Sequence, residues 1–346
     1  MIKNQIPIFY HKDQLLFKPK HEWAFGRRIN HPERSKRAEM ILKALEAQSK
    51  DFELIIPKRV TEDELKKTHS ELLIKLYKTA EKIAKDNTYY PSIFPKRHQA
   101  VASPDNLLHA GFFCFDSGTP LNAFTWLAAS WSAACALEGA QFIGQKKGNL
   151  VYSLCRPPGH HATKDLFGGY CYFNNAAIAA KHLRQKGEIA LVDIDFHHGN
   201  GTQDLFYKDN KVLFISIHAD PREYYPFFSG FESERGEGLG LDYNYNFPLP
   251  KKTDSQAYLN VIDKKVLPLI KKYNADYLIL SAGFDTYKLD PIGGFSLETS
   301  DYTAIGERFG KCKLPTLVLQ EGGYHTEDLG RNVIALLEGL KRTLPA

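Results

Sequence analysis

Two acidic residues and one histidine are candidate ligands for a metal ion. Asp195 and His197 are two residues apart, so on an extended segment both side chains project to the same side. Asp285, which follows a distant apolar run, adds a third ligand. Two carboxylates and one imidazole that leave a coordination position free suit catalytic zinc, although Fe(II), Co(II) or Mn(II) also fit such ligands. The alternative interpretation is a hydrogen-bonded strand end without a metal.

Two adjacent histidines are candidates for proton transfer. His160 and His161 follow Pro157-Pro158-Gly159, a stiff turn that fixes the backbone ahead of both imidazoles. One ring could accept a proton while the other stays charged, and Asp193 and Asn200 are candidates to orient the two rings. The alternative is that both histidines are structural or bind a metal.

Tyr324 is a candidate hydrogen-bond donor to a reacting carbonyl. It follows two glycines, which allow loop conformations that other residues resist. A phenol there could donate to a carbonyl oxygen as negative charge develops on that oxygen. The alternative is a loop tyrosine that packs on the rim of the site.

Five short apolar runs, rich in β-branched residues, end directly before polar segments that could carry this chemistry. They span residues 150–154, 189–192, 212–217, 277–280 and 316–319. Their near-continuous apolarity predicts an α/β fold with a central parallel sheet between helix layers. Helices are predicted at 119–148, beginning with Thr119-Pro120, and at 174–186, 255–273, 300–311 and 327–343. Ligands bind outside the carboxyl ends of such strands, so the polar segments should meet at one site.

Length and composition predict a single domain, 1–346, with one irregular insertion at 87–106. No apolar stretch is long enough to cross a membrane and the N-terminus lacks a signal-peptide pattern, so we predict a cytoplasmic protein with no membrane partner. The five cysteines have no Cys-x-x-Cys spacing, which argues against a disulfide framework. The net charge of +5 is spread along the chain and does not indicate a nucleic-acid partner.

Five motifs follow one another along the chain. They are Arg-Pro-Pro-Gly-His-His-Ala (156–162), Gly-Gly-Tyr-Cys-Tyr-Phe-Asn-Asn (168–175), Asp-Ile-Asp-Phe-His-His-Gly-Asn-Gly-Thr-Gln (193–203), Ser-Ala-Gly-Phe-Asp (281–285) and Glu-Gly-Gly-Tyr (321–324). In this order they resemble the histone deacetylase superfamily, and within it the bacterial acetylpolyamine amidohydrolases. The resemblance implies an arginase-like α/β fold and hydrolysis of an acetylamide to acetate and a free amine.

The resemblance also implies a role for individual residues. One Zn²⁺ would be held by Asp195, His197 and Asp285. His161 would act as general base and acid, His160 as its electrostatic partner paired with Asp193, and Tyr324 as the donor to the carbonyl. The substrate channel would be lined by Gly169, Tyr170 and Tyr225, with Arg37 bordering an internal acetate exit. K⁺ or Na⁺ would bind at Asp193, Asp195, His197, Ser216 and Ile217, and at a second site near Phe206, Asp209, Val212 and Tyr243.

The channel entrance departs from the polyamine-specific pattern. Leu107 and Gly118 stand where the bacterial polyamine enzymes carry acidic residues, although Asp116 is close. Ile292 stands where a polyamine-selective eukaryotic relative has an acidic gatekeeper. The insertion 87–106 resembles a loop through which the bacterial branch forms a homodimer and narrows its active site. The substrate therefore stays open between a small acetylated polyamine and an acetyl-lysine peptide.

Two other functions fit parts of the pattern. An arginase-type binuclear manganese hydrolase shares the fold but needs a further carboxylate at position 199, which is Gly199. A protein that binds an acetylated ligand without cleaving it would lack a catalytic tyrosine or histidine, and all of them are present. The number and kind of metal ions per chain distinguish these functions.

Overall fold

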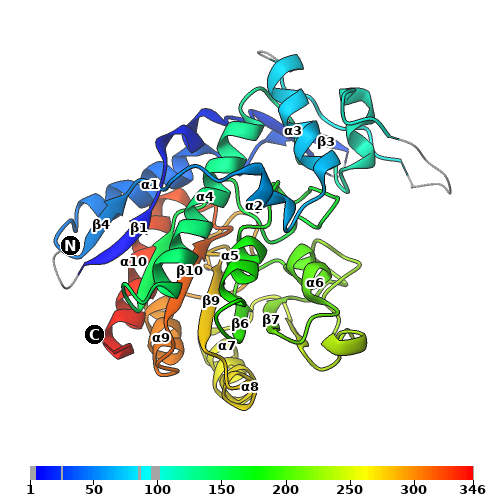
Figure 1. Ribbon diagram of the computed structural model, residues 1–346. Coiled ribbons are helices and arrows are strands. Elements are labelled where there is room, and N and C mark those ends of the chain that lie inside the picture. The colour runs from blue at the N-terminus through cyan, green and yellow to red at the C-terminus, as the bar shows by residue number, and fades with distance from the viewer. Residues whose placement is uncertain (1–4, 25, 85–86, 95–101, 346) are drawn as a thin grey trace.

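The computed structural model describes residues 5–24, 26–84, 87–94 and 102–345 (Figure 1). Within these residues, eight strands form one parallel sheet in the order β4-β1-β5-β10-β9-β6-β7-β8, and β2 and β3 form a separate antiparallel hairpin. The strands are Ile6–Phe9 (β1), His21–Ala24 (β2), Arg27–Asn30 (β3), Phe52–Ile55 (β4), Leu150–Ser153 (β5), Ile189–Asp193 (β6), Val212–Ala219 (β7), Asn244–Leu249 (β8), Tyr277–Ala282 (β9) and Thr316–Gln320 (β10). The predicted parallel sheet between helix layers is confirmed.

Helices cover both faces of the sheet, as Figure 1 shows. The α-helices are Ser35–Glu46 (α1), Glu62–Lys66 (α2), Glu71–Ile83 (α3), Thr125–Gly144 (α4), Asn175–Leu183 (α5), Asn200–Phe206 (α6), Ser255–Val261 (α7), Leu267–Tyr273 (α8), Thr299–Gly310 (α9) and Thr326–Thr343 (α10). Short 3₁₀ segments are Lys12–Leu16 (η1), Leu107–Phe112 (η2) and Gly238–Gly240 (η3), and a π-helical segment, Ile262–Val266 (η4), joins α7 to α8.

Alternate residues of each central strand pack against different helix layers. On β6, Ala190 and Val192 face the layer that contains α1 and α7 to α10, whereas Ile189 and Leu191 face the layer that contains α4, α5 and α6. Both faces of the sheet are therefore buried. This double burial explains why the strands appear in the sequence as continuous apolar runs rather than as alternating patterns.

The five apolar runs correspond to β5, β6, β7, β9 and β10, but the pattern misses β1, β4 and β8. β8 is an edge strand with two asparagines among its buried positions. The side-chain amides of Asn244 and Asn246 donate to Gln203 Oε1 (2.8 and 2.7 Å). Buried amides with partners replace the apolar residues by which a central strand is recognised.

The predicted start of the helix at 119–148 is wrong. The helix α4 begins at Thr125 and ends at Gly144, and the Thr-Pro pair lies in the preceding loop. There Thr119 Oγ1 accepts the Tyr170 N–H (2.9 Å), and the Pro120 carbonyl accepts the Tyr172 hydroxyl. The pair therefore holds the turn around residue 170 instead of capping a helix.

A smaller group of segments lies beside α4, where α3 and η2 pack on it in a second apolar cluster. The hairpin β2–β3 is attached to the same region, because the Tyr90 hydroxyl donates to the His21 carbonyl (2.6 Å). Of the predicted insertion 87–106, residues 95–101 lie outside the described residues. In the described part, Tyr89 forms a bridge with Leu121. No helix in the described ranges is long and apolar enough to span a membrane.

Candidate active site

The polar segments that follow the central strands meet at the carboxyl edge of the sheet. Asp193, at the end of β6, lies beside Ser216 of β7 and Ser281 of β9 in the strand register. Ala282 of β9 pairs with Gln320, the last residue of β10. The sheet thus brings together the segments that the sequence predicts to share one site.

Asp195, His197 and Asp285 form a compact group of metal-ligand side chains. One ligand atom of each lies within 4.8 Å of the other two. His197 Nδ1 is 3.1 Å from Asp285 Oδ2 and 3.4 Å from Asp195 Oδ1. The chain bends over 195–197 rather than continuing β6 as an extended strand. The two ligands from this segment therefore meet through a turn in which Asp195 Oδ1 accepts the His197 N–H (2.8 Å).

The chemistry of this group fits a divalent metal ion. Burial and the charge of Asp195 raise the pKa of Asp285 to about 7. Burial also opposes ionisation of Asp195, but the charges of His160 and His197 hold the pKa of that carboxyl below its ordinary value. A divalent cation resolves the repulsion because it pairs with both carboxylates, and the oxygen and nitrogen donors are among those that zinc accepts.

The adjacent imidazoles have different partners and opposite charge tendencies. Nδ1 of His160 lies 2.9 Å from Asp193 Oδ2, and Nδ1 of His161 lies 2.7 Å from Asn200 Oδ1. Burial opposes a charge on His160, but Asp193 and Asp195 outweigh it and raise the pKa of His160 to about 10. Burial and the charge of His160 hold the pKa of His161 well below its ordinary value. His161 is therefore a neutral imidazole able to accept a proton, whereas His160 is cationic.

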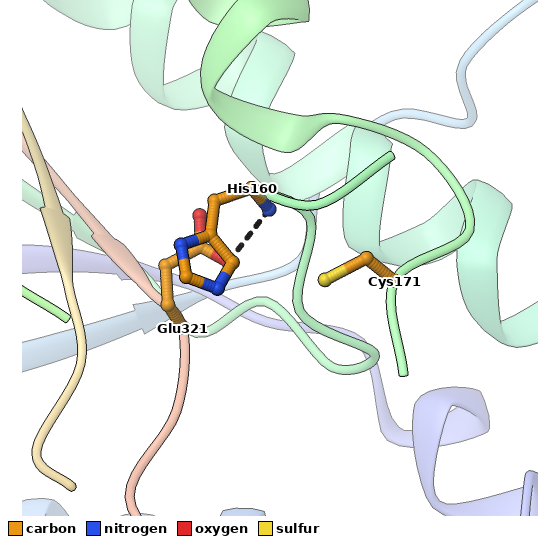
Figure 2. Close-up of side chains that lie close together, drawn as sticks. All are labelled: His160, Cys171 and Glu321. Atoms are coloured by element: carbon orange, nitrogen blue, oxygen red, sulfur yellow. Dashed lines mark hydrogen bonds between the residues drawn. The ribbon is translucent and has the colours of Figure 1, made fainter. Parts of the chain in front are cut away.

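Glu321 supports the turn that carries the two histidines (Figure 2). Its Oε2 accepts hydrogen bonds from the N–H groups of Gly159 (2.7 Å) and His160 (3.2 Å), and its Oε1 accepts one from Ser281 Oγ (3.0 Å). Cys171 lies beside them, and its thiol donates to a backbone carbonyl (3.3 Å). His160, Cys171 and Glu321 also bring ligand atoms within 4.8 Å of one another. The carboxylate oxygens already hold protein donors, however, which favours a hydrogen-bonded support over a second metal site.

Tyr324 is held through both its backbone and its ring. Asp290 Oδ2 accepts the N–H groups of Tyr324 (2.5 Å) and of the next residue (3.1 Å). Arg37 donates to the Gly323 carbonyl (2.5 Å), and its guanidinium lies 4.7 Å from the Tyr324 ring centroid. Burial raises the pKa of the Tyr324 phenol, so the hydroxyl keeps its proton and can donate a hydrogen bond. Ile292 lies beside this turn, because Asp290 Oδ1 accepts its N–H (3.1 Å).

Tyr170 and Tyr225 flank these groups as aromatic walls. The Tyr170 ring centroid is 6.0 Å from that of Tyr324, and the Tyr225 ring centroid is 5.0 Å from that of His161. Gly169 has a φ of +56°, and a Cβ at this position would collide with the His161 ring. Only glycine therefore allows the backbone to approach the imidazole in this conformation.

Two carboxylates lie next to the walls. Asp116 Oδ2 accepts the Tyr225 hydroxyl (2.9 Å). Glu22, on β2, accepts the Tyr170 hydroxyl, and burial raises the pKa of Glu22 to about 7. A Cβ on Gly118 would lie 3.1 Å from Glu22 Oε2. The Glu22 carboxylate therefore packs against Gly118, where even a Cβ would crowd it.

The residues predicted to bind monovalent cations lie in two regions. Asp193, Asp195, His197, Ser216 and Ile217 lie around the ends of β6 and β7, next to the candidate metal ligands. Phe206, Asp209, Val212 and Tyr243 lie around the connection from α6 to β7, where the carbonyls of Phe206 and Tyr243 each accept a backbone N–H (2.9 Å). Each predicted set is thus assembled within one region of the structure.

Sequence reasoning misses several buried acidic residues around the site. Glu321 falls within one of the quoted motifs and Asp290 within an Asp-Pro pair, which is a turn signal. Either could have been interpreted as a carboxylate that accepts backbone N–H groups. Glu22 and Glu33 come from the N-terminal segment, and no local pattern connects them with residues far along the chain.

Known proteins resemble this chain over nearly its whole length. The family model for the histone deacetylase domain matches residues 31–340. Acetylpolyamine amidohydrolase 2 of Pseudomonas aeruginosa is 40% identical over 339 residues, which cover 96% of this chain and 98% of that protein. The acetylpolyamine amidohydrolase of Mycoplana ramosa is 36% identical over 342 residues, with 96% and 99% covered. A crystal structure of an acetylpolyamine aminohydrolase from Burkholderia pseudomallei has a TM-score of 0.93 at 33% identity, covering 99% of this chain and 100% of that one. These likenesses bear out the resemblance carried by the five motifs.

Proposed function

This chain belongs to the histone deacetylase family, and on that premise we propose that it is a zinc-dependent deacetylase that hydrolyses small acetylated polyamines to acetate and a free amine. The observation that carries the proposal is the convergence of a metal-ligand group, a histidine pair and a tyrosine donor at one edge of the sheet. These are the parts that hydrolysis of an amide requires.

Asp195, His197 and Asp285 would hold one zinc ion. Bound there, zinc would act as a Lewis acid that polarises the amide carbonyl and acidifies the attacking water. An arginase-type second metal is disfavoured, because it needs a carboxylate at position 199 and even a Cβ on Gly199 would collide with the Asp193 carboxylate. The intact set of histidines and tyrosine disfavours a protein that binds its ligand without cleaving it.

His161 would be the general base and then the general acid. Asn200 holds its Nδ1, which leaves Nε2 to take a proton from the attacking water and pass it to the departing amine. His160, kept protonated by Asp193, would supply positive charge beside the reacting carbonyl. Tyr324 would donate a hydrogen bond to the carbonyl oxygen as that oxygen gains negative charge. Arg37, which underlies the tyrosine turn, would border the exit for acetate.

The channel supports a slender, cationic substrate. The aromatic walls of Tyr170 and Tyr225 suit an alkyl chain, because apolar chains pack well against aromatic faces. Glu22 supplies an acidic group beside Gly118, where the chain itself has no side chain. A protonated amine of the substrate would pair with this carboxylate. The names of the relatives from Pseudomonas aeruginosa and Mycoplana ramosa support the same substrate class.

An acetyl-lysine peptide is the second candidate substrate. Leu107 and Ile292 favour it, because the resemblance places these apolar residues where polyamine-selective relatives carry acidic ones. The decisive experiment measures turnover of acetylputrescine, acetylspermidine and an acetyl-lysine peptide side by side, together with the metal content of the enzyme. We expect one zinc ion per chain and the highest kcat/KM for the acetylated polyamines. A higher kcat/KM for the peptide would identify acetyl-lysine as the substrate. Two manganese ions per chain would indicate an arginase-type hydrolase instead of a deacetylase.

We also propose that the chain forms a homodimer through the segment 87–106. Phe94, whose side chain is 76% exposed, and the partly exposed Ile93 precede the residues that the structure does not describe. Burial of these exposed apolar side chains against a second chain would favour dimer formation. Sedimentation should give a dimer at micromolar concentration, and deletion of 88–104 should give a monomer with relaxed selectivity for bulky acetyl-lysine substrates. A monomeric intact protein, or a deletion that alters neither mass nor selectivity, contradicts this interface.

K⁺ or Na⁺ would occupy the two regions described above, at the ends of β6 and β7 and at the connection from α6 to β7. Backbone carbonyl oxygens can replace the hydration shell of K⁺. Activity in potassium, sodium and tetramethylammonium chloride at constant ionic strength tests this part, and equal activity in all three salts would count against it. We propose that the protein acts in the cytoplasm.

A further inference from the structure

One carboxylate holds Gly169 and Tyr225, two residues of the proposed substrate channel. Asp116 Oδ2 accepts hydrogen bonds from the Gly169 N–H and from the Tyr225 hydroxyl (2.9 Å). Asp116 Oδ1 accepts the Gly118 N–H of its own turn (2.9 Å). The Asp116 side chain therefore joins the segment before α4 to the loop after β5 and to the loop after β7.

Both groups that Asp116 holds are in contact with His161. The Gly169 backbone packs against the His161 ring so closely that a Cβ there would collide with it. The Tyr225 ring meets the same imidazole edge-to-face, with centroids 5.0 Å apart and planes at 89°. A carboxylate that fixes these two neighbours also restricts the imidazole, which Asn200 orients through Nδ1.

We propose that Asp116 is a positioning residue that sets the width of the channel and the orientation of His161, rather than the acidic group that recognises the ammonium of the substrate. The inference rests on the proposed deacetylase function. Three donors already occupy the two oxygens of Asp116, so a substrate ammonium would have to displace one of them. Glu22 is the other carboxylate beside the walls, where it accepts the Tyr170 hydroxyl and its Oε2 lies against Gly118.

Loss of this anchor has two consequences for catalysis. The Tyr225 ring is no longer tied to the opposite wall, so the channel widens and admits acyl groups longer than acetyl. His161 also loses a fixed neighbour, and displacement of a general base by about 1 Å costs roughly 10²-fold in rate. Neither consequence depends on whether the substrate carries a positive charge.

The test compares Asp116→Asn, Tyr225→Phe and the double variant with the wild-type holoenzyme. The substrates are acetylputrescine, its uncharged analogue N-pentylacetamide, and butyrylputrescine. Asp116→Asn should lower kcat about 10-fold to 100-fold on both acetyl substrates, change KM by less than about 2-fold, and raise the ratio of butyryl to acetyl turnover. Tyr225→Phe, which keeps the ring, should shift kcat and acyl selectivity in the same direction by less. In the double variant the second substitution should add little, because the two residues share one hydrogen bond.

Two control variants separate positioning from charge. Glu22→Gln should raise KM for acetylputrescine more than it raises KM for N-pentylacetamide. Asp63→Asn, an exposed carboxylate on α2, should leave all the rates unchanged. Circular dichroism and metal content, measured on every variant, detect misfolding. If Asp116→Asn does not fold, Tyr225→Phe still tests the proposal, because it removes the hydrogen bond between the same two residues.

The inference is overturned if Asp116→Asn raises KM for the charged substrate alone, since the carboxylate would then recognise the ammonium. It is also overturned if kcat and the butyryl-to-acetyl ratio stay unchanged in both single variants, or if the two substitutions are additive. A wild-type enzyme that cleaves none of the acetylated amines would instead overturn the proposed function. That result is visible before any variant is made.

Discussion

Removal of the charge on Glu33 should strongly lower the free energy of unfolding, because Glu33 is the buried partner of two arginines. Its Oε1 accepts hydrogen bonds from Arg156 Nε (2.8 Å) and from Arg37 Nη1 (3.1 Å), and all three side chains are buried. Burial opposes ionisation of Glu33, but the charges of Arg156 and Arg37 hold its pKa below the ordinary value. The substitution Glu33→Gln keeps the shape and leaves two buried cations without their counter-charge.

The expected cost is about 3–5 kcal/mol, the range for breaking a buried ion pair by neutralising one partner. The entropy of unfolding is about 2.1 cal/mol/K per residue, which for 346 residues gives roughly 0.7 kcal/mol/K. The melting temperature should therefore fall by about 4–7 °C. The folded-state pKa of Glu33 is depressed, so its stabilising contribution is present above the ordinary carboxyl pKa and is lost as pH falls through the folded value. The gap between wild type and variant should accordingly narrow in acid.

Calorimetry at neutral and acidic pH measures this gap, and Glu39→Gln on the exposed side of α1 is the matched control. The control should shift the melting temperature by less than about 1 °C, because surface substitutions stay within about 0.5 kcal/mol. Arg37 also donates to the carbonyls of Glu321 and Gly323 (2.5 Å each), so kcat should fall in Glu33→Gln as the tyrosine turn loosens. A shift of less than about 2 °C at neutral pH would refute the reasoning, since a buried pair of this kind cannot lose its anion at so small a cost.

Three further outcomes are expected. Tyr324→Phe keeps the ring and loses the donor, so kcat should fall by about 10²-fold or more with little change in KM, and near-native kcat in steady-state assays would contradict the role. Asp285→Ala should abolish tight metal binding. An unchanged metal-to-protein ratio in elemental mass spectrometry would argue against Asp195, His197 and Asp285 as the metal ligands. Burial lowers the pKa of His69 to about 3, with Nδ1 at 2.8 Å from the Thr163 carbonyl and Nε2 accepting the Asn174 N–H (2.9 Å). Between about pH 6.5 and 3, His69 is therefore protonated in the unfolded chain but neutral in the folded one. The free energy of unfolding should fall over this range as pH decreases, by up to roughly 1.4 kcal/mol per pH unit. In His69→Gln, urea titrations between pH 6 and 5 should show a shallower fall, and parallel curves for the two proteins would disprove the assignment.

The strand ends and the chemistry beside them could be predicted from the sequence because local patterns carry both. Each central strand is a continuous apolar run, and the parallel sheet then requires that the segments after the runs share one edge. Asp195 and Asp285 could be paired by this argument although they are 90 positions apart in numbering. The same argument misses the edge strand β8, since its buried Asn244 and Asn246 donate hydrogen bonds to Gln203 instead of forming an apolar run.

The supporting residues could not be predicted because their partners are far away in the chain. The resemblance predicts only that Asp116 lies close to the channel entrance, and the hydrogen bond from Tyr225 to Asp116 spans 109 positions. The Thr119-Pro120 pair shows the converse error, in which a strong local signal for a helix start serves a contact with Tyr170 instead. Local propensity was outweighed in that loop by a buried donor that needed an acceptor.

The hairpin β2–β3 can evolve separately from the main sheet. It carries Glu22 on a sheet of its own, outside the eight-stranded sheet of the described residues, and β3 is exposed along its length. Substitutions in the hairpin therefore disturb few contacts in the layers that hold the α/β body together. In the proposed function the Glu22 carboxylate meets the substrate amine, so a change of charge there falls in the hairpin, whereas the requirements of folding act mainly on the eight-stranded sheet and its helices. Lineages exposed to different amines should accordingly diverge in the hairpin sooner than in the strands.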